Sequence, residues 1–353
     1  MEMKFELTKK IEGRYLLKNG KILSVNDNGD EIKIYANMTY KFEYTLKLEE
    51  PLISLFELND NKSIIFILEN KIIKFDSINL KIITSSKNNN NINNFNLELK
   101  SGNLLSSTDD HLIIFNGETL QEEQIIKFQL YEDDFYGRKP NFIELEKGTI
   151  FINDLYNFYF FVIKDNKYIL KYKIKSVELP QETAAFLPYN QVTLVNAYKI
   201  RDNSIFLGYN ECIDTDEVFK IIEIKFIDEK IVYNKIMDVF KPKKFDEFFI
   251  INNSHFIVLN EYDDDKIIII DDKFNIINKL NVEGYSYVNF INGLLLLQSE
   301  NIFYIYKIEN NSFFEVFKLE DIEVEAAHIL TEGILVIESE NQFYFYSFKN
   351  KMN

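Results

Sequence analysis

The sequence predicts an all-β protein, a closed β-propeller built from eight four-stranded blades, with seven blades as the alternative. Three observations lead to this prediction. Hydrophobic and polar residues alternate with a period of two along almost the whole chain, as in half-buried strands. Groups of four such runs recur every 39 to 55 residues. If the chain is read on from the start of the last group, past the C-terminus, to the start of the first group, the distance is 41 residues, which matches the same repeat.

Each group begins with an apolar strand, continues through two turns and two further strands, and ends with a longer connector and a fourth strand. The leading strands start at Ile22, Ile64, Leu104, Ile150, Ile205, Phe256, Leu295 and Ile334. The groups at Ile150 and Ile205 are the longest, so an insertion there would reduce the count to seven. Only residues 182–187 and 324–330 suggest a helical turn.

The chain ends are predicted to share one blade. The last group holds only two strands, Ile334–Ser339 and Phe343–Phe348, and the segments Lys4–Thr8 and Arg14–Leu17 would supply the two that it lacks. Such sharing completes the blade and prevents the ring from opening. No linker divides the chain, so residues 1–353 are expected to form a single domain. The asparagine-rich run Asn88–Asn94 is expected to be a loose external loop.

Charge and cysteine content exclude several classes of partner. Fifty-six acidic against 40 basic residues give a net charge of −16, which repels nucleic acid and anionic lipid. No apolar stretch reaches the roughly 18 residues of a membrane helix, so membrane insertion is not expected. The single cysteine, Cys212, suits a reducing compartment, and we expect a cytoplasmic protein.

No set of residues predicts catalysis, a metal site or a cofactor. The three histidines, His111, His255 and His328, fall in different repeats, which argues against a shared metal site. The acidic clusters do not have the ligand spacing of a calcium loop. Only three arginines occur, in non-equivalent positions, and the chain lacks a glycine-rich phosphate loop and a nucleophile elbow.

Several groups share a sequence pattern in their second and third strands. It is seen in Asp30–Tyr35, Asn70–Asp76, Asp110–Phe115 and Asp265–Asp271, each followed by a short turn and an amphipathic strand. This sequence pattern resembles that of a WD-repeat (WD40-like) propeller, with Tyr, Phe or Ile in the place of the family's Trp. Asp76 and Asp271 stand where the family has its Asp. The resemblance covers nearly the whole chain and implies a non-catalytic scaffold that docks partners on its faces and edges.

One face of the predicted propeller is acidic. The turn after each leading strand and the long connector emerge on the same side, and these turns contain Asp27, Asp30, Asp109, Asp110, Asp214, Asp216, Asp263, Asp264, Asp265, Glu300 and Glu340. The two longest connectors contain Phe135, Tyr136 and Arg138, and Phe186 and Tyr189. Tyr and Arg are favoured interface anchors, although these aromatic residues fit equally well as caps on their own blades. We predict that Phe135, Tyr136, Arg138, Phe186, Tyr189, Asp109, Asp110 and Asp263–Asp265 bind a partner.

Two classes of function remain. The first is a non-catalytic intracellular protein-interaction scaffold, of the kind that serves as a subunit of larger assemblies, which binds a protein with a basic surface. The second is a propeller hydrolase or a lectin-like ligand-binding protein whose site is assembled from residues far apart in sequence. The absence of a catalytic motif favours the first class, although fold alone does not decide function.

Overall fold

Eight antiparallel sheets, each of four strands, make up the computed structural model of the chain. The structure describes residues 5–12, 15–36, 41–130, 140–154, 156–176, 192–213, 216–238, 248–252, 255–260, 266–271, 275–282, 284–330, 334–339 and 342–348. Their contacts divide the chain into two compact units. The first contains residues 1–94, 264–267 and 278–353, and the second contains residues 95–263 and 268–277. The expectation of a single domain stays a prediction.

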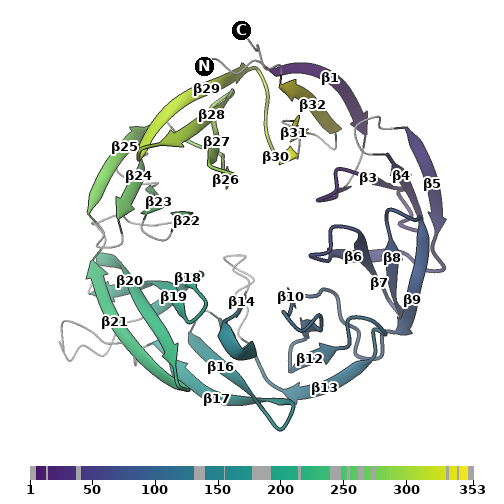
Figure 1. The fold of residues 1–353 in the computed structure, drawn as a ribbon, viewed down its shortest axis with the longest axis horizontal. Helices are drawn as coiled ribbons and strands as arrows, with labels where there is room; N and C mark the ends of the chain where they lie inside the picture. The colour runs from purple at the N-terminus through teal and green to yellow at the C-terminus, as the bar shows by residue number, and fades with distance from the viewer. Residues whose placement is uncertain are drawn as a thin grey trace. The chain divides into compact units, whose positions relative to one another are not determined.

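Blades 1, 2, 7 and 8 belong to the first unit (Figure 1). Blade 1 consists of β2 (Tyr15–Leu16), β3 (Ile22–Val25), β4 (Glu31–Tyr35) and β5 (Phe42–Lys47). Blade 2 consists of β6 (Leu52–Glu57), β7 (Ser63–Leu68), β8 (Lys71–Asp76) and β9 (Lys81–Lys87). Blade 7 consists of β26 (Tyr287–Ile291), β27 (Leu294–Ser299), β28 (Ile302–Glu309) and β29 (Ser312–Glu320). Blade 8 consists of β30 (Ala326–Leu330), β31 (Ile334–Ser339), β32 (Gln342–Phe348) and the N-terminal β1 (Phe5–Glu12).

Blades 3, 4 and 5 belong to the second unit, and blade 6 has residues in both. Blade 3 consists of β10 (Leu97–Glu98), β11 (Leu104–Ser107), β12 (His111–Phe115) and β13 (Glu122–Lys127). Blade 4 consists of β14 (Asn141–Glu144), β15 (Ile150–Asn153), β16 (Asn157–Lys164) and β17 (Lys167–Lys175), with a 3-10 turn at Glu146–Gly148. Blade 5 consists of β18 (Val192–Arg201), β19 (Ser204–Ile213), β20 (Asp216–Ile227) and β21 (Lys230–Asp238). Blade 6 consists of β22 (Phe248–Asn252), β23 (His255–Asn260), β24 (Lys266–Asp271) and β25 (Ile276–Asn281).

The blade count and the β fold class are confirmed, and the alternative of seven blades is wrong. Each of the eight predicted leading strands is the second strand of a blade, and each predicted start falls on its first or second residue. The fourth strand of each predicted group is therefore the first strand of the next blade. The groups at Ile150 and Ile205 are long because they include long connectors and, in blade 5, strands of 10 and 12 residues.

Burial within a blade decreases towards its outer strand. All six residues of β7 are buried, as are the first six of β16. The outer strands β13 and β25 instead alternate between half-buried and exposed residues. A strand that is buried on both faces reads as a continuous apolar run, whereas an outer strand with one covered face alternates. These two patterns are the ones that the sequence displays.

Neighbouring blades within each unit stack their apolar faces. Blades 1 and 2 share a cluster that includes Leu23, Ile34, Phe66 and Phe75. In the second unit, the rings of Phe160 and Phe226 stack between blades 4 and 5 with centroids 4.9 Å apart. Each large apolar side chain that is fully buried in such a cluster stabilises the fold by about 1.5–3 kcal/mol. Stacking between blades is therefore the main source of stability.

A β-bulge interrupts the outer strand of each of the seven blades whose outer-strand register is described. The unpaired residues are Thr8, Glu43, Ile83, Glu123, Lys171, Asn234 and Val316. A bulge twists the strand and breaks the row of free backbone groups that would otherwise pair with another sheet edge. The alternation pattern of the sequence did not predict these bulges.

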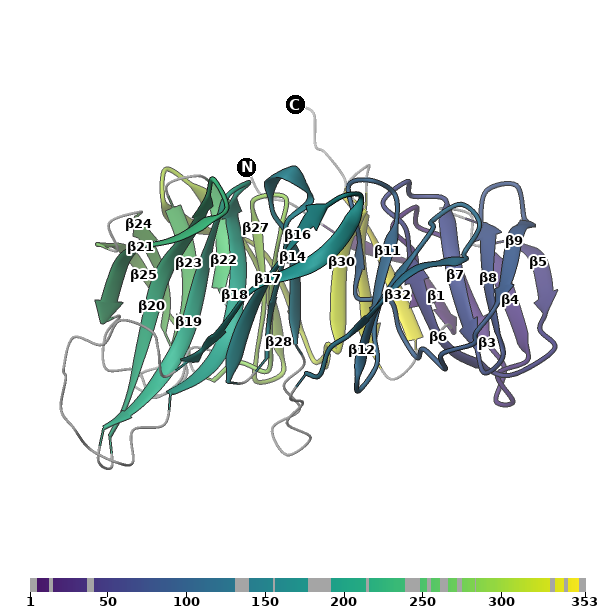
Figure 2. The same cartoon turned by 90° about the horizontal axis from the view of Figure 1, so that it is seen from below.

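The two chain ends meet in blade 8, as predicted, but the allocation of strands differs. Only β1 joins the C-terminal strands, where it pairs antiparallel with β32 (Figures 1 and 2). The expectation that the second N-terminal segment, Arg14–Leu17, also joins this blade is wrong, because Tyr15–Leu16 begins blade 1. The fourth strand of blade 8 is instead β30, which pairs with β31.

The helical turn expected at residues 324–330 is also wrong, because Ala326–Leu330 forms strand β30. Ala326 and Ala327 suggest a helix from local propensity, but pairing with β31 overrides that preference. Ala327 is fully buried at the interface of blades 7 and 8, where a small side chain fits. The other segment with a predicted helical turn, 182–187, lies outside the described residues.

The asparagine-rich run is an ordered connector between blades 2 and 3 rather than a loose loop. Asn88 is 5% exposed and Ile92 is fully buried. The Asn88 side-chain amide donates to the carbonyls of Leu68 and Ile92 at 3.0 Å each, and its oxygen accepts the Ile92 N–H at 2.9 Å. One side chain therefore holds the connector to the blade.

Removal of residues 1–12 should lower the thermal midpoint of the protein by at least about 5 °C, because blade 8 loses its outer strand and the edge of β32 is exposed. Differential scanning calorimetry measures the effect. A variant without residues 1–4 only, which keeps β1, is the matched control. An unchanged midpoint after removal of all twelve residues would contradict the pairing of β1 with β32.

Replacement of Asn88 by Ala should lower the free energy of unfolding by about 2–3 kcal/mol, because buried partners lose their hydrogen bonds. Urea denaturation measures the change. Asn89→Ala, at the exposed next position, should change stability by less than about 0.5 kcal/mol. Equal effects of the two variants would show that the connector does not depend on Asn88.

Candidate interaction face

The strand order places two sets of loops at opposite ends of each blade. The chain reverses at every turn, so the turn between the second and third strands lies at the same end as the connector to the next blade. We call this end the connector face. The turns between the first and second strands and between the third and fourth strands form the opposite face. The side view in Figure 2 shows turns at both ends of the strands.

Backbone hydrogen bonds join the turns and connectors of blades 1 and 2. Leu48 N donates to the Asp30 carbonyl at 2.8 Å, and Leu52 N donates to the Gly29 carbonyl at 2.9 Å. Gly29 has φ +74°, and a Cβ at this position would lie 3.3 Å from the Pro51 side chain and the Leu52 nitrogen. The turn Asn28-Gly29 therefore needs glycine both for its conformation and for the close approach of the connector.

Carboxylates hold the next turn of the same face. Asn70 donates its backbone N–H to Glu50 Oε2 at 2.8 Å and its side-chain amide to Oε1 at 3.2 Å. Lys71 forms an ion pair with Glu49 at 3.0 Å. Glu50 is therefore used to build the face, whereas Glu49 and Glu69 remain exposed to solvent.

Between blades 7 and 8, the buried side chain of Gln298 takes the corresponding role. Its amide nitrogen donates to the carbonyls of Glu300 and Ile322, and its oxygen accepts the Val324 N–H at 2.7 Å. Beside this connector, burial and the nearby charge of Glu325 raise the pKa of the Glu338 carboxyl. The sequence offered no signal for Gln298, since a single Gln in a strand has many other possible roles.

Exposed acidic residues gather on the connector face of the first unit. They come from three turns and two connectors, namely Asp27, Asp30, Glu49, Glu69, Glu300, Asp321, Glu323 and Glu325. Lys71 neutralises Glu49, and the lysines that end β5 and β9, Lys47 and Lys87, stand at the outer border. The excess of carboxylates produces a negative potential that favours basic ligands.

In the second unit, the structure describes two of the predicted site residues. Asp109 and Asp110 lie exposed in the turn between β11 and β12. Asp110 Oδ1 lies 2.6 Å from Nδ1 of His111. The backbone carbonyl of Asp110 accepts the Phe128 N–H at 2.8 Å. The remaining predicted residues, Phe135, Tyr136, Arg138, Phe186, Tyr189 and Asp263–Asp265, lie outside the described residues.

One exposed aromatic residue of the connector face was missed by the sequence analysis. Tyr156 is 47% exposed in the turn between β15 and β16. The buried Asp154 fixes this turn by accepting the N–H groups of Tyr156 and Asn157 at 2.9 and 2.7 Å. The Asp154 carboxylate also accepts the Tyr159 hydroxyl at 2.8 Å. An Asp three residues before an Asn at a strand end is the signal that could have located the turn.

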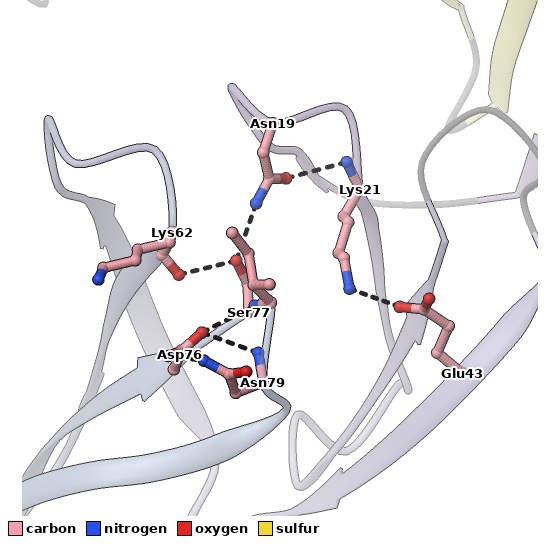
Figure 3. Close-up of polar contacts among 8 residues, drawn as sticks. Asn19, Lys21, Glu43, Lys62, Asp76, Ser77 and Asn79 are labelled. Carbon is pink, nitrogen blue, oxygen red and sulfur yellow. Dashed lines mark hydrogen bonds and ion pairs between the residues drawn. The ribbon is translucent and has the colours of Figure 1, made fainter.

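The opposite face holds a polar network that joins blades 1 and 2 (Figure 3). Asn19 donates to the Ser77 hydroxyl at 2.8 Å, and Ser77 donates to the Lys62 carbonyl at 2.7 Å. Lys21 forms an ion pair with Glu43, the bulge residue of β5. Burial raises the pKa of Asp76, but hydrogen bonds from Asn79 and Ile78 outweigh it and hold that pKa below its usual value. These groups satisfy one another, which indicates a structural role.

The same contact between adjacent blades occurs twice on the opposite face. The backbone N–H of Lys18 donates to the Glu57 carboxylate of the next blade at 2.6 Å, and that of Lys100 donates to Glu144 at 2.6 Å. Burial raises the pKa of Glu57, which the hydrogen bond and charge of Lys18 oppose. The equivalent positions in two repeats show that neighbouring blades are joined by a repeated polar contact as well as by apolar stacking.

The described residues contain no group of three or more His, Cys, Asp or Glu side chains that could hold a metal ion. The three histidines lie in separate blades, His111 on β12, His255 on β23 and His328 on β30. Burial lowers the pKa of His328. Among the described residues, no helix combines the length and the apolar composition of a membrane span.

Comparisons with known proteins identify the fold. No family of known sequences matches the chain, and no curated protein sequence does. Among solved structures, Sqt1 from Saccharomyces cerevisiae matches with a TM-score of 0.62 and 11% identity over 99% of this chain and 98% of that chain. BamB from Moraxella catarrhalis matches with a TM-score of 0.59 and 7% identity over 98% of this chain and 100% of that one.

A third similar structure is the dihydro-heme d1 dehydrogenase NirN, with a TM-score of 0.60 and 10% identity over 98% of this chain and 76% of that chain. These likenesses confirm the resemblance to a divergent WD40-like β-propeller in fold. At such low identities they carry no statement about activity, and the group includes an enzyme.

Proposed function

We propose that this protein is a non-catalytic scaffold that binds a partner protein with a basic surface through its connector face. The observation that supports the proposal is the gathering of exposed carboxylates on the connector face of the first unit, from three turns and two connectors. Complementary charge accelerates association and selects partners of the opposite sign, with a strong dependence on salt.

Aromatic residues would provide the apolar contacts of such an interface. Asp109, Asp110 and Tyr156 lie on the connector face, and the connectors before and after blade 4 contain Phe135, Tyr136 and Arg138, and Phe186 and Tyr189. Asp263–Asp265 follow the second strand of blade 6. Tyr and Arg at the centre of an interface commonly supply much of the binding energy, while the surrounding charges set specificity. The single cysteine supports a cytoplasmic location for the scaffold.

The alternative function, a hydrolase or lectin-like protein, is compatible with the fold because NirN is an enzyme of similar structure. Elemental analysis for a bound metal and turnover in a panel of hydrolase substrates would test it.

Charge reversal on the connector face should weaken binding of a stoichiometric partner at least about tenfold, because several favourable charge pairs become repulsive. The variant carries Asp27→Lys, Glu69→Lys, Asp109→Lys and Glu323→Lys, all at exposed positions in different loops. The partner is the protein that co-purifies with the tagged chain in equal amount. Titration calorimetry at about 50 and 200 mM salt measures the dissociation constant.

A control variant reverses four exposed glutamates outside the connector face, Glu118, Glu146, Glu309 and Glu315, and has the same net charge. It should bind within about twofold of the wild type. A second variant, with Phe135, Tyr136 and Arg138 replaced by Ala, should weaken binding without changing the thermal midpoint. Unchanged binding by both site variants would contradict the proposed face.

A further inference from the structure

The outer strand of blade 4 is basic in a strongly acidic protein. Strand β17 and the turn before it, residues 164–175, contain Lys164, Lys167, Lys171, Lys173 and Lys175 against one acidic residue, Asp165. All five lysines are exposed. We call this segment the lysine strand. The chain as a whole has a net charge of −16, so the sign of this segment is opposite to that of the chain.

Protection of the sheet edge does not explain so many lysines. Lysine on an outer strand prevents pairing with other sheets, but this edge is already interrupted by the bulge at Lys171. The side-chain amide of Gln124 in blade 3 also forms hydrogen bonds with both backbone groups of Tyr168. It accepts the Tyr168 N–H at 2.8 Å and donates to the Tyr168 carbonyl at 2.7 Å. The other outer strands contain one or two lysines each, whereas β17 contains four and no acidic residue.

Several of these ammonium groups are available to a ligand. Lys171 forms an ion pair with Glu229 at 2.8 Å, and Lys173 lies 5.6 Å from the centre of the Tyr159 ring. Within the part of the chain that the structure describes, Lys164, Lys167 and Lys175 form no ion pair. The unpaired charges are spread along the whole length of the strand.

Exposed aliphatic side chains lie between the lysines. Ile169 and Leu170 are 39% and 42% exposed on the lysine strand, and Ile163 is exposed just before it. Ile227 and Val232 of the neighbouring blade 5 are exposed as well. The Tyr172 hydroxyl donates to the Glu229 carbonyl at 3.1 Å, which joins the two blades beside these residues. Lysines and exposed aliphatic residues therefore alternate along the sequence of this outer strand.

We propose that the lysine strand is a second docking surface, which binds an extended acidic segment of a partner protein. The carboxylates of the segment would pair with the lysines, and apolar side chains between them would pack on Ile169 and Leu170. Side chains carry the recognition, because the bulge and Gln124 interrupt backbone pairing. At about 3.3 Å per residue, the strand accommodates an extended segment of about nine residues.

A peptide fits this surface better than a nucleic acid or a membrane does. Both of these are extended polyanions, which the net charge of −16 repels over distances of about a Debye length. Neither offers apolar side chains spaced between its charges in register with Ile169 and Leu170. The inference goes beyond the proposed function, because it concerns a different surface and a ligand of opposite charge.

The test uses a fluorescent ten-residue peptide in which glutamate alternates with valine, measured by anisotropy against the full chain. The wild type should bind it saturably, with an affinity that falls as salt rises from about 50 to 200 mM. Lys167→Glu, Lys173→Glu and Lys175→Glu together should weaken binding at least about tenfold. These three changes leave the pair of Lys171 with Glu229 in place.

The matched control reverses three exposed lysines outside blade 4, Lys41→Glu, Lys81→Glu and Lys279→Glu, and should bind within about twofold of the wild type. A peptide in which glutamine alternates with valine should not bind. The inference is overturned by any of three results: no saturable binding up to about 1 mM peptide, equal weakening by both triple variants, or equal binding of the glutamine peptide. Binding of oligodeoxythymidine or of phosphatidylserine vesicles instead of the peptide would also overturn it.

Discussion

A four-stranded antiparallel blade cannot bury both of its own faces, and the architecture of this protein depends on that constraint. A strand such as β16 is apolar on both sides, so it is stable only when blades lie against it on either side. The stacked clusters that contain Phe66, Phe160 and Phe303 are the result. Because the flat faces of the blades are used for stacking, the ends of the strands and the outer strands are among the surfaces that remain available for other roles.

These remaining surfaces differ in chemistry. On the opposite face, Asn19 bonds to Ser77, and Lys18 and Lys100 bond to glutamates of the next blade, so polar groups there join blades. On the connector face, many carboxylates are left exposed to solvent. The outer strands are interrupted by bulges, and one of them concentrates lysine. The two proposed docking surfaces therefore carry charges of opposite sign, which favours ligands of opposite sign.

The sequence predicted those features of the structure that depend on neighbouring residues, and it missed those that depend on contacts between distant residues. The second strands were located to within a residue because short continuous runs of Ile, Leu and Phe, bounded by turn residues, are typical of a fully buried strand. The strand at Ala326 was missed because alanine has no strong preference of its own and the pairing partner decides. Asn88 was assigned to a loose loop because composition does not show that one amide bonds to the connector. The acidic turns were visible as Asp and Asn clusters, whereas the role of Gln298 depends on contacts with a distant segment.

Hydrogen–deuterium exchange measured segment by segment tests most directly the claim that stacking between blades stabilises the fold. The account predicts that the amides of the buried second strands, such as β7, β11 and β27, exchange slowest and at similar rates. The outer strands, such as β13 and β25, should exchange faster because one side of each lacks a hydrogen-bonded neighbour. Slow exchange in the outer strands together with rapid exchange in β7 or β27 would contradict the account.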